Sequence, residues 1–359
     1  MSEKRGLPLL NRLAGSLALP IASVLVALLI AAVLIAVEGK DPWAAFRSLY
    51  VGAFGNLETI ASSVATAVPL TLAALGVAFA FRAGVFNIGG PGQIYLGAVA
   101  ATLVGTRFPG LSIWVHLPLA LLAGFLAGGL YAVIPGTLKV QRGFNEVILT
   151  ILMNYLAINF VSYLLHGPMK DPAANYPQSE LITPTARLPQ LMKGTELHGG
   201  LFLMIVGAIA LYWILDRTVL GYQVRAVGGN PQAARYGGIA VGKIIIVAML
   251  ISGGLSGLAG SSMVLGTNFR LLETFALDMG YDAIAVALLG RLNPVGVVLA
   301  GLFFGALRNS ANVMQIMNGI PVTLIQVIQA VVILCVLAGS YVQWKPFIFK
   351  GRRGVGRAA

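Results

Sequence analysis

The chain has 359 residues, of which 58% are hydrophobic and only 10% are charged, whereas soluble domains carry about 25% charged residues. The formal net charge is +12, but the basic residues are spread over loops and form no basic face, which excludes a nucleic-acid-binding protein. Apolar runs of about 20 residues recur and can cross a bilayer as helices. The fold class that we expect is therefore all-α, a polytopic membrane protein. A β-barrel would show short alternating segments instead.

The predicted elements begin with a basic N-terminal segment, residues 1–16, that resembles the start of a signal peptide. The apolar run behind it, about 20 residues, is too long for a typical signal sequence, so we predict a retained first span. The transmembrane domain covers residues 17–341, and a basic tail follows at 342–359. We expect about ten transmembrane or partly re-entrant helices: 17–37, 57–80, 93–107, 113–138, 146–166, 200–216, 243–266, 276–290, 295–310 and 321–341. The third, eighth and ninth are short for a full crossing, which suggests tilted, broken or partly re-entrant helices.

The distribution of positive charge predicts the orientation. With the N-terminus in the cytoplasm, the inside segments carry most of the 24 lysines and arginines, as the positive-inside rule requires. We therefore expect both termini in the cytoplasm of a bacterial plasma (inner) membrane. The polar loop 167–198 is then external, and the longest cytoplasmic connection is 217–242.

The stretch FRAGVFNIGGPGQIYLGAVAA, residues 81–101, interrupts the apolar pattern with glycines and a proline. Such backbone is tolerated at membrane depth only when it is buried in protein or lines a wet cavity. Two interpretations remain open. The stretch is either an ordinary cytoplasmic turn, or a broken helix at which Phe86, Asn87 and Gln93 contact or gate the substrate.

The stretch GFNEVILTILMNYLA, residues 143–157, places three polar side chains on the fifth span. Asn145 and Glu146 lie near its predicted cytoplasmic end, where Glu146 either is solvated and caps the helix or contacts the substrate. Asn154 lies deeper, where its amide either joins neighbouring helices or faces the pathway. Uncharged polar groups of this kind suit a neutral, hydroxyl-rich substrate.

A second discontinuous region covers residues 280–312, with a predicted inner turn around Asn293, which we include in the pathway. Asp278 and Asp282 lie at its predicted outer end, and we expect both to face the exterior.

The segment GYQVRAVGGNPQAARYGGI, residues 221–239, predicts a short polar helix. Asn230 is a good N-cap and Pro231 suits the first helical position, while Gly237-Gly238 supplies the stop. A helix of under two turns needs something to pack on. It is either a linker helix resting on lipid headgroups or a docking helix for a cytoplasmic partner.

This segment resembles the coupling helix of ABC-transporter permeases that import ribose, simple sugars and nucleosides, whose pattern is close to G-x-x-x-R-A-V-G-x-N-P-x-A-A-x-x-x-G-I. Residues 81–93 and 143–157 are similar to the nucleoside-type subgroup, although Pro91 stands where that subgroup commonly has Glu. The resemblance implies a type II-like importer permease that docks an ATPase through these residues: Arg225, Ala226, Val227, Gly228, Asn230, Pro231, Ala233, Ala234, Arg235, Gly237 and Gly238.

The resemblance also implies partners. They are a cytoplasmic ABC ATPase, a second permease subunit forming a heterodimer, an external solute-binding protein and a small-molecule substrate, with nucleosides favoured over simple sugars. The alternative is a stand-alone secondary transporter or channel, which needs no capped cytoplasmic helix.

Motifs of catalysis are missing from the sequence. It contains no G-x-x-x-x-G-K-[ST] phosphate loop, no H-E-x-x-H, no Cys/His cluster and no serine elbow. We therefore expect no catalytic residue, metal or cofactor in this chain, and ATP hydrolysis on a separate subunit. The three histidines, His116, His166 and His198, fall near loops or span ends, and we expect them to be solvated.

Overall fold

The computed structural model describes residues 25–335 except 277, 322, 325 and 332–333. Over this part of the chain the structure is helical, and outside the helices it forms only two isolated β-bridges. Six of the described helices are long and apolar enough to cross a membrane. The expected all-α polytopic membrane fold is confirmed. The predicted cytoplasmic segments 1–16 and 342–359 lie outside the described residues, as do the start of the first span and the end of the last.

The chain divides into two compact units, and each is described separately. The smaller unit is Met1–Arg47 with Met314–Ala359, and the larger is Ser48–Val313. Described parts of the smaller unit include the apolar helix Leu25–Val37. Helix α2 (Pro42–Phe54), which begins there and continues into the larger unit by sequence, was not predicted.

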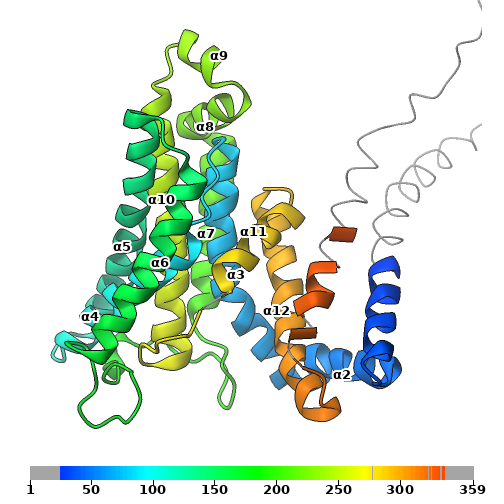
Figure 1. Cartoon of the computed structure of the whole chain (residues 1–359). Helices are drawn as coiled ribbons and strands as arrows, with labels where there is room; N and C mark the ends of the chain where they lie inside the picture. Colours follow the sequence, from blue (N-terminus) through cyan, green and yellow to red (C-terminus); the bar gives the residue numbers. More distant parts are fainter. Residues whose placement is uncertain (1–24, 277, 322, 325, 332–333, 336–359) are drawn as a thin grey trace, which may run out of the picture. The chain divides into compact units, whose positions relative to one another are not determined.

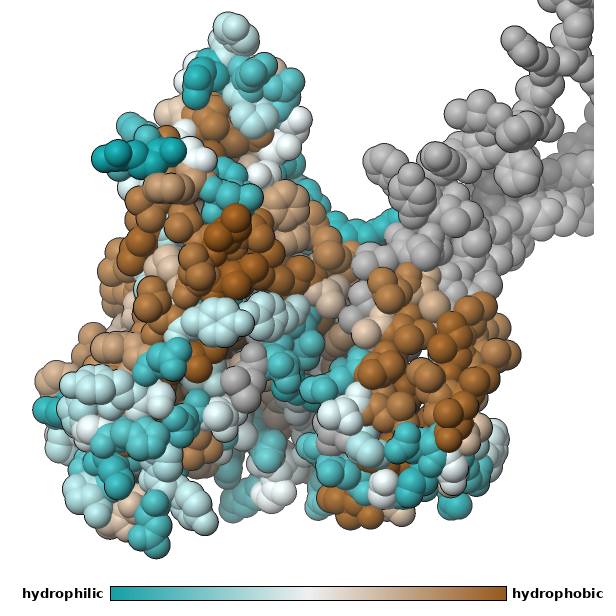
Figure 2. All heavy atoms as spheres, viewed as in Figure 1, coloured by the Kyte–Doolittle hydropathy of each residue, from teal (hydrophilic) through white to brown (hydrophobic). Residues whose placement is uncertain are grey.

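Most helices of the larger unit agree with the predicted elements to within a few residues. The helix Val219–Gly229 was not predicted, and α12 extends beyond its predicted end and past Val313, where the unit ends. The helices are α3 (Leu57–Arg82), α4 (Gly90–Arg107), α5 (Ile113–Arg142), α6 (Glu146–His166), α7 (Gly200–Arg217), α8 (Val219–Gly229), α9 (Pro231–Tyr236), α10 (Val241–Met263), α11 (Met279–Leu289) and α12 (Pro294–Asn318). The end of this bundle that carries α8 and α9 is called the α9 end below, and the opposite end, with residues 167–198, the loop end (Figure 1). On the visible face, hydrophobic side chains form a belt between hydrophilic ends (Figure 2).

Glycines let three helices cross at backbone contact. A Cβ atom added to Gly97 on α4 would overlap the backbone of Gly257 on α10, and one added to Gly128 on α5 would overlap Gly253. Small residues at helix crossings are the usual way to pack spans in lipid, where no hydrophobic driving force brings helices together. The close packing of α4, α5 and α10 therefore depends on glycine, which has no side chain, at these positions.

Two short helices that follow non-helical segments meet inside the larger unit. Helix α3 ends at Arg82, residues 85–89, called the extended segment below, have no regular secondary structure, and α4 starts at Gly90. A second non-helical segment, described at 269–276 and 278, precedes α11, and a Cβ atom on Gly90 would lie 3.2 Å from the carbonyl oxygen of Gly280. The two short helices therefore begin side by side. Residues 81–93 combine features of both alternatives: the chain turns at Ala83-Gly84 beside α8, and the non-helical residues that lead into α4 are largely buried in protein.

The two short helices point in opposite directions. The Gly105 carbonyl near the end of α4 accepts a hydrogen bond from the Thr183 amide of the loop end (3.0 Å). The Leu292 carbonyl just beyond α11 accepts one from Arg82 Nε (2.9 Å), at the end of α3 that faces α8. Helix α4 thus leads to the loop end, and α11 leads to the α9 end.

Two histidines at the loop end are buried, so the expectation that all three are solvated was wrong. The His116 ring is paired with Thr185 Oγ1 (2.8 Å) and the Val104 carbonyl (2.9 Å). His198 accepts a hydrogen bond from the Gly200 amide (3.0 Å) and is only 1% exposed. Burial lowers the pKa of His198 to about 4, because the charged form would be desolvated. His198 is therefore neutral at physiological pH.

We predict that Gly257→Ala destabilises the bundle while Gly207→Ala does not. A methyl group at Gly257 would overlap the Gly124 backbone, and overpacking of this kind costs about 1–3 kcal/mol. At Gly207, on α7, the nearest neighbour of the added carbon is 3.5 Å away, which is an ordinary contact. Thermal melting in detergent measures the difference, and equal melting temperatures for the two variants would contradict the packing described above.

Candidate functional site

Asn87 holds the extended segment between α3 and α4 in place. Its Nδ2 donates to Gln93 Oε1 (3.0 Å) and to Ser252 Oγ on α10 (2.8 Å). Its Oδ1 accepts from the Gly89 amide (3.0 Å) and from Gln93 Nε2 (2.9 Å). An amide side chain has two donor hydrogens and two acceptor lone pairs, so the capacity of Asn87 is fully used inside the protein.

Asn154 connects α6 to the same segment. Its Oδ1 accepts from the Gly92 amide (2.9 Å), and its Nδ2 donates to the Ile88 carbonyl (3.0 Å). Asn154 is 1% exposed. The geometry favours the alternative in which this side chain joins helices, since both backbone groups belong to the turn that restarts α4.

Glu146 is buried at the start of α6, although a solvated carboxylate was one of our alternatives. It forms an ion pair with Lys139 near the end of α5 and accepts a hydrogen bond from the Phe86 amide (3.3 Å). Its neighbour Asn145 caps α6 by accepting from the Val147 amide (2.9 Å). Glu146 therefore ties two spans and the extended segment together.

The predicted pathway residues separate into two groups. Asn87, Gln93, Glu146 and Asn154 are brought together around the extended segment, and the half-exposed ring of Phe86 packs edge-on against Phe81. Asn293 lies apart and caps α12, accepting from the Val295 amide (3.0 Å). Contact of any of these side chains with substrate stays a prediction.

Helix α8 packs against the ends of two spans, α7 and α3. Its buried side is formed by Gly221, Val224 and Val227. A Cβ atom at Gly221 would overlap carbonyl groups at the end of α7, and one at Gly228 would overlap the Arg82 carbonyl at the end of α3. Close backbone approach at both glycines fixes α8 against α7 and α3.

Helix α9 follows α8 directly and has the predicted start and stop. Asn230 Oδ1 accepts hydrogen bonds from the amides of Gln232 (3.0 Å) and Ala233 (3.1 Å), with Pro231 at the first helical position. The Gly237 amide donates to the Ala233 carbonyl (3.0 Å), and Gly238 has a φ of 82°, which favours glycine. The predicted caps are confirmed.

The outer face of α9 differs from the predicted set of docking residues. Ala234 and Val227 are 6% and 1% exposed, so they anchor the two helices instead of facing outward. Ala233 and Arg235 are exposed. Tyr236 was missed by the sequence reasoning, although it is 94% exposed; a lone aromatic residue on a very short polar helix is the signal that could have identified it.

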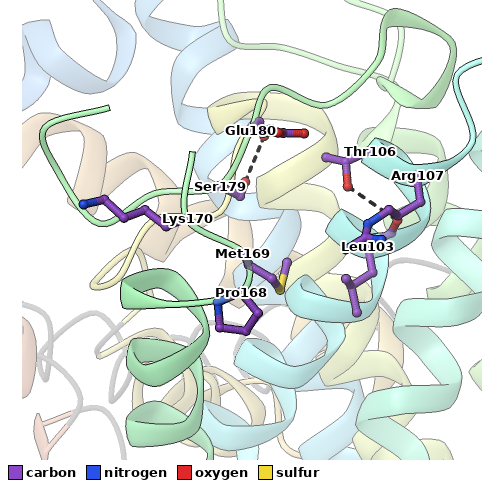
Figure 3. Close-up of a pocket in the computed structure, with 8 residues that line it drawn as sticks. All are labelled: Leu103, Thr106, Arg107, Pro168, Met169, Lys170, Ser179 and Glu180. Carbon is purple, nitrogen blue, oxygen red and sulfur yellow. Dashed lines mark hydrogen bonds between the residues drawn. The ribbon is translucent and has the colours of Figure 1, made fainter. Parts of the chain in front are cut away.

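A cavity of about 140 Å³ opens at the loop end, between α4 and the segment 167–198 (Figure 3). Its lining combines charged and apolar side chains: Leu103, Thr106, Arg107, Pro168, Met169, Lys170, Ser179 and Glu180. The segment 167–198 is hydrogen-bonded to the residues that follow α10 in sequence. The amides of Ser179 and Ile182 donate to the carbonyls of Leu271 (3.0 Å) and Phe269 (2.9 Å). The loop end is therefore a structured surface.

A bundle of apolar spans with a buried broken helix and a capped helix at one end is the architecture of a multi-pass transport protein. Residues 59–337 match the family described as "Branched-chain amino acid transport system / permease component", and the chain belongs to this family. It is a membrane-spanning permease subunit of an ABC importer.

Several relatives of this chain have names that state a substrate. It is 37% identical to the guanosine ABC transporter permease NupP of Bacillus subtilis over 90% of this chain and 94% of the relative. It is 35% identical to the glucose ABC transporter permease TsgB13 of Haloferax volcanii (90% and 87%) and 30% identical to the nucleoside ABC transporter permease NupB of Lactococcus lactis (90% and 91%). No solved structure matches the chain.

We predict that Asn154→Leu lowers the stability of the permease while Asn159→Leu on the same helix does not. Leucine at 154 leaves the Gly92 amide and the Ile88 carbonyl unpaired in a buried site, at about 1–3 kcal/mol for each group. Asn159 is exposed and its side chain donates only to the Tyr155 carbonyl of its own helix. Thermal melting in detergent tests this; similar losses in both variants would rule out a special role for Asn154.

Proposed function

We propose that this permease imports nucleosides or closely related simple sugars, with nucleosides preferred. The support comes from the relatives that match nearly the whole chain, two of which are named as guanosine or nucleoside permeases. Pro91 fits the start of α4, where proline suits the first helical turn.

We infer that α9 docks a separate cytoplasmic ABC ATPase, on which ATP is hydrolysed. The supporting observation is the shape of the α8–α9 element. Helix α8 is fixed by backbone contacts to two spans, and α9 projects beyond it with Arg235 and Tyr236 exposed. An exposed aromatic ring next to an arginine is the kind of pair that anchors protein interfaces. A helix that only rested on headgroups would not need such a rigid base.

In this proposal the α9 end faces the cytoplasm, and both termini are cytoplasmic. An external solute-binding protein delivers its solute to the loop end, and a second permease subunit, most simply a different chain, completes the path. Closure of the ATPase pair displaces α9, and the spans rearrange to open an inward route. The permease performs no covalent chemistry.

We predict that Arg235→Glu and Tyr236→Ala each reduce co-purification of the ATPase at least 10-fold without changing membrane insertion. Both changes alter exposed side chains that we expect to contact the ATPase, and they leave the caps of α9 intact. Arg142→Glu, at the end of α5, is the matched control because it makes the same charge reversal at the same end of the bundle. Ala234→Glu is a poor test, since the buried side chain would disturb packing as well. Unchanged ATPase recovery from both α9 variants would refute the docking role.

The transport proposal is tested with the permease, its partner subunits and a binding protein in proteoliposomes. We predict uptake of radiolabelled guanosine or glucose that requires ATP on the side of the α9 end. Uptake at full rate by this chain alone, without ATP, would instead establish a stand-alone transporter or channel.

A further inference from the structure

Asp282 and Arg308 form an ion pair between α11 and α12. Arg308 Nη1 lies 3.1 Å from Asp282 Oδ2, and the side chains are 34% and 33% exposed. Asp282 is therefore paired within the protein, which the sequence analysis did not predict; that it faces the exterior stays a prediction. A carboxylate in the first turn of one helix is instead joined to a guanidinium in the middle of another.

The pair lies at membrane depth. Asp282 is two residues beyond Gly280, which touches the start of α4. At 1.5 Å per residue, the 18 residues of α4 extend about 27 Å from there toward the loop end, and the 11 residues of α11 extend about 16 Å toward the α9 end. The hydrocarbon core of a bilayer is about 30 Å thick. If α4 and α11 together cross the bilayer, Asp282 lies inside this core.

A partly open charge pair at this depth is costly against lipid tails, because charged groups there lose their hydration. Holding two helices together does not require charge either, since neutral or apolar side chains often replace such pairs at no loss of stability. Ionisable residues inside the membrane instead tend to face a polar pathway. The open side of the pair therefore belongs to a surface that is polar in the assembled transporter.

The first turn of α11 carries a third polar side chain, that of Tyr281, next to Asp282 in sequence. Its side chain is 43% exposed, and its hydroxyl lies 3.5 Å from Nδ2 of Asn154, the residue that holds the broken helix. The three residues offer a carboxylate that accepts hydrogen bonds, a guanidinium that donates them, and a phenol that does both. This set complements a neutral solute with neighbouring donors and acceptors. A guanine base has this pattern, because its N1–H and 2-amino group suit a carboxylate and its O6 and N7 suit an arginine.

We propose that Tyr281, Asp282 and Arg308 form a solute-contacting site on the transport path, and that it recognises the hydrogen-bonding edge of a purine base. The inference rests on the proposed nucleoside transport, and it adds which residues form hydrogen bonds with the base. As the solute passes, the ion pair between Asp282 and Arg308 breaks, and both side chains form hydrogen bonds with the base instead.

The test uses the complete transporter in proteoliposomes, with guanosine and inosine supplied at concentrations that saturate the binding protein. The two nucleosides differ only in the 2-amino group, which we assign to Asp282. We expect Asp282→Asn to reduce the ratio of guanosine to inosine uptake about 10-fold, and Arg308→Gln to reduce uptake of both. The melting temperature of each variant is measured alongside uptake, because losing one partner of the ion pair can also lower stability. Glu58→Gln, an exposed carboxylate at the start of α3, is the control.

A double variant separates recognition from a structural role. If the pair only joins helices, Asp282→Asn with Arg308→Gln restores wild-type uptake and leaves the guanosine-to-inosine ratio unchanged, and that result would overturn the inference alone. Equal loss of both nucleosides in Asp282→Asn, together with a lower melting temperature, would also overturn it. If the unaltered complex carries neither nucleoside nor glucose, the proposed function fails and the site falls with it.

Discussion

The centre of this permease depends on amide side chains that pair the backbone of the non-helical segment in front of α4. This segment is largely buried, and unpaired amide and carbonyl groups in such a place cost several kcal/mol each. Asn87 and Asn154 supply partners for the amides of Gly89 and Gly92 and for the Ile88 carbonyl. Because these side chains belong to or bond with α6 and α10, the interruption is stable only when those spans are in place.

Local signals explain which parts of the fold could be predicted. The apolar runs gave the spans, and the Asn230-Pro231 and Gly237-Gly238 pairs fixed the ends of α9, because capping is decided within a few residues of the chain. The glycines and proline of residues 81–93 indicated an interruption for the same reason. Helix α2 had no comparable signal.

Long-range partners explain what could not be predicted. His116 is buried because Thr185, far along the chain, offers it a hydrogen bond, and Asp282 is paired because Arg308 lies on the next helix. The inward position of Ala234 likewise follows from the packing of α9, which its own sequence does not reveal. In each case the residue type is compatible with exposure, and only the tertiary neighbour decides.

The contact between Gly228 on α8 and Gly84 in the turn after α3 has a mechanical consequence. A Cβ atom on Gly84 would lie 3.2 Å from the Cα atom of Gly228, so the two backbones touch with no side chain between them. Side chains in an ordinary contact can change rotamer and absorb a small displacement, whereas this joint has no such slack. A displacement of α8 at this point would press directly on the turn that leads to Asn87, because no side chain lies between the two backbones.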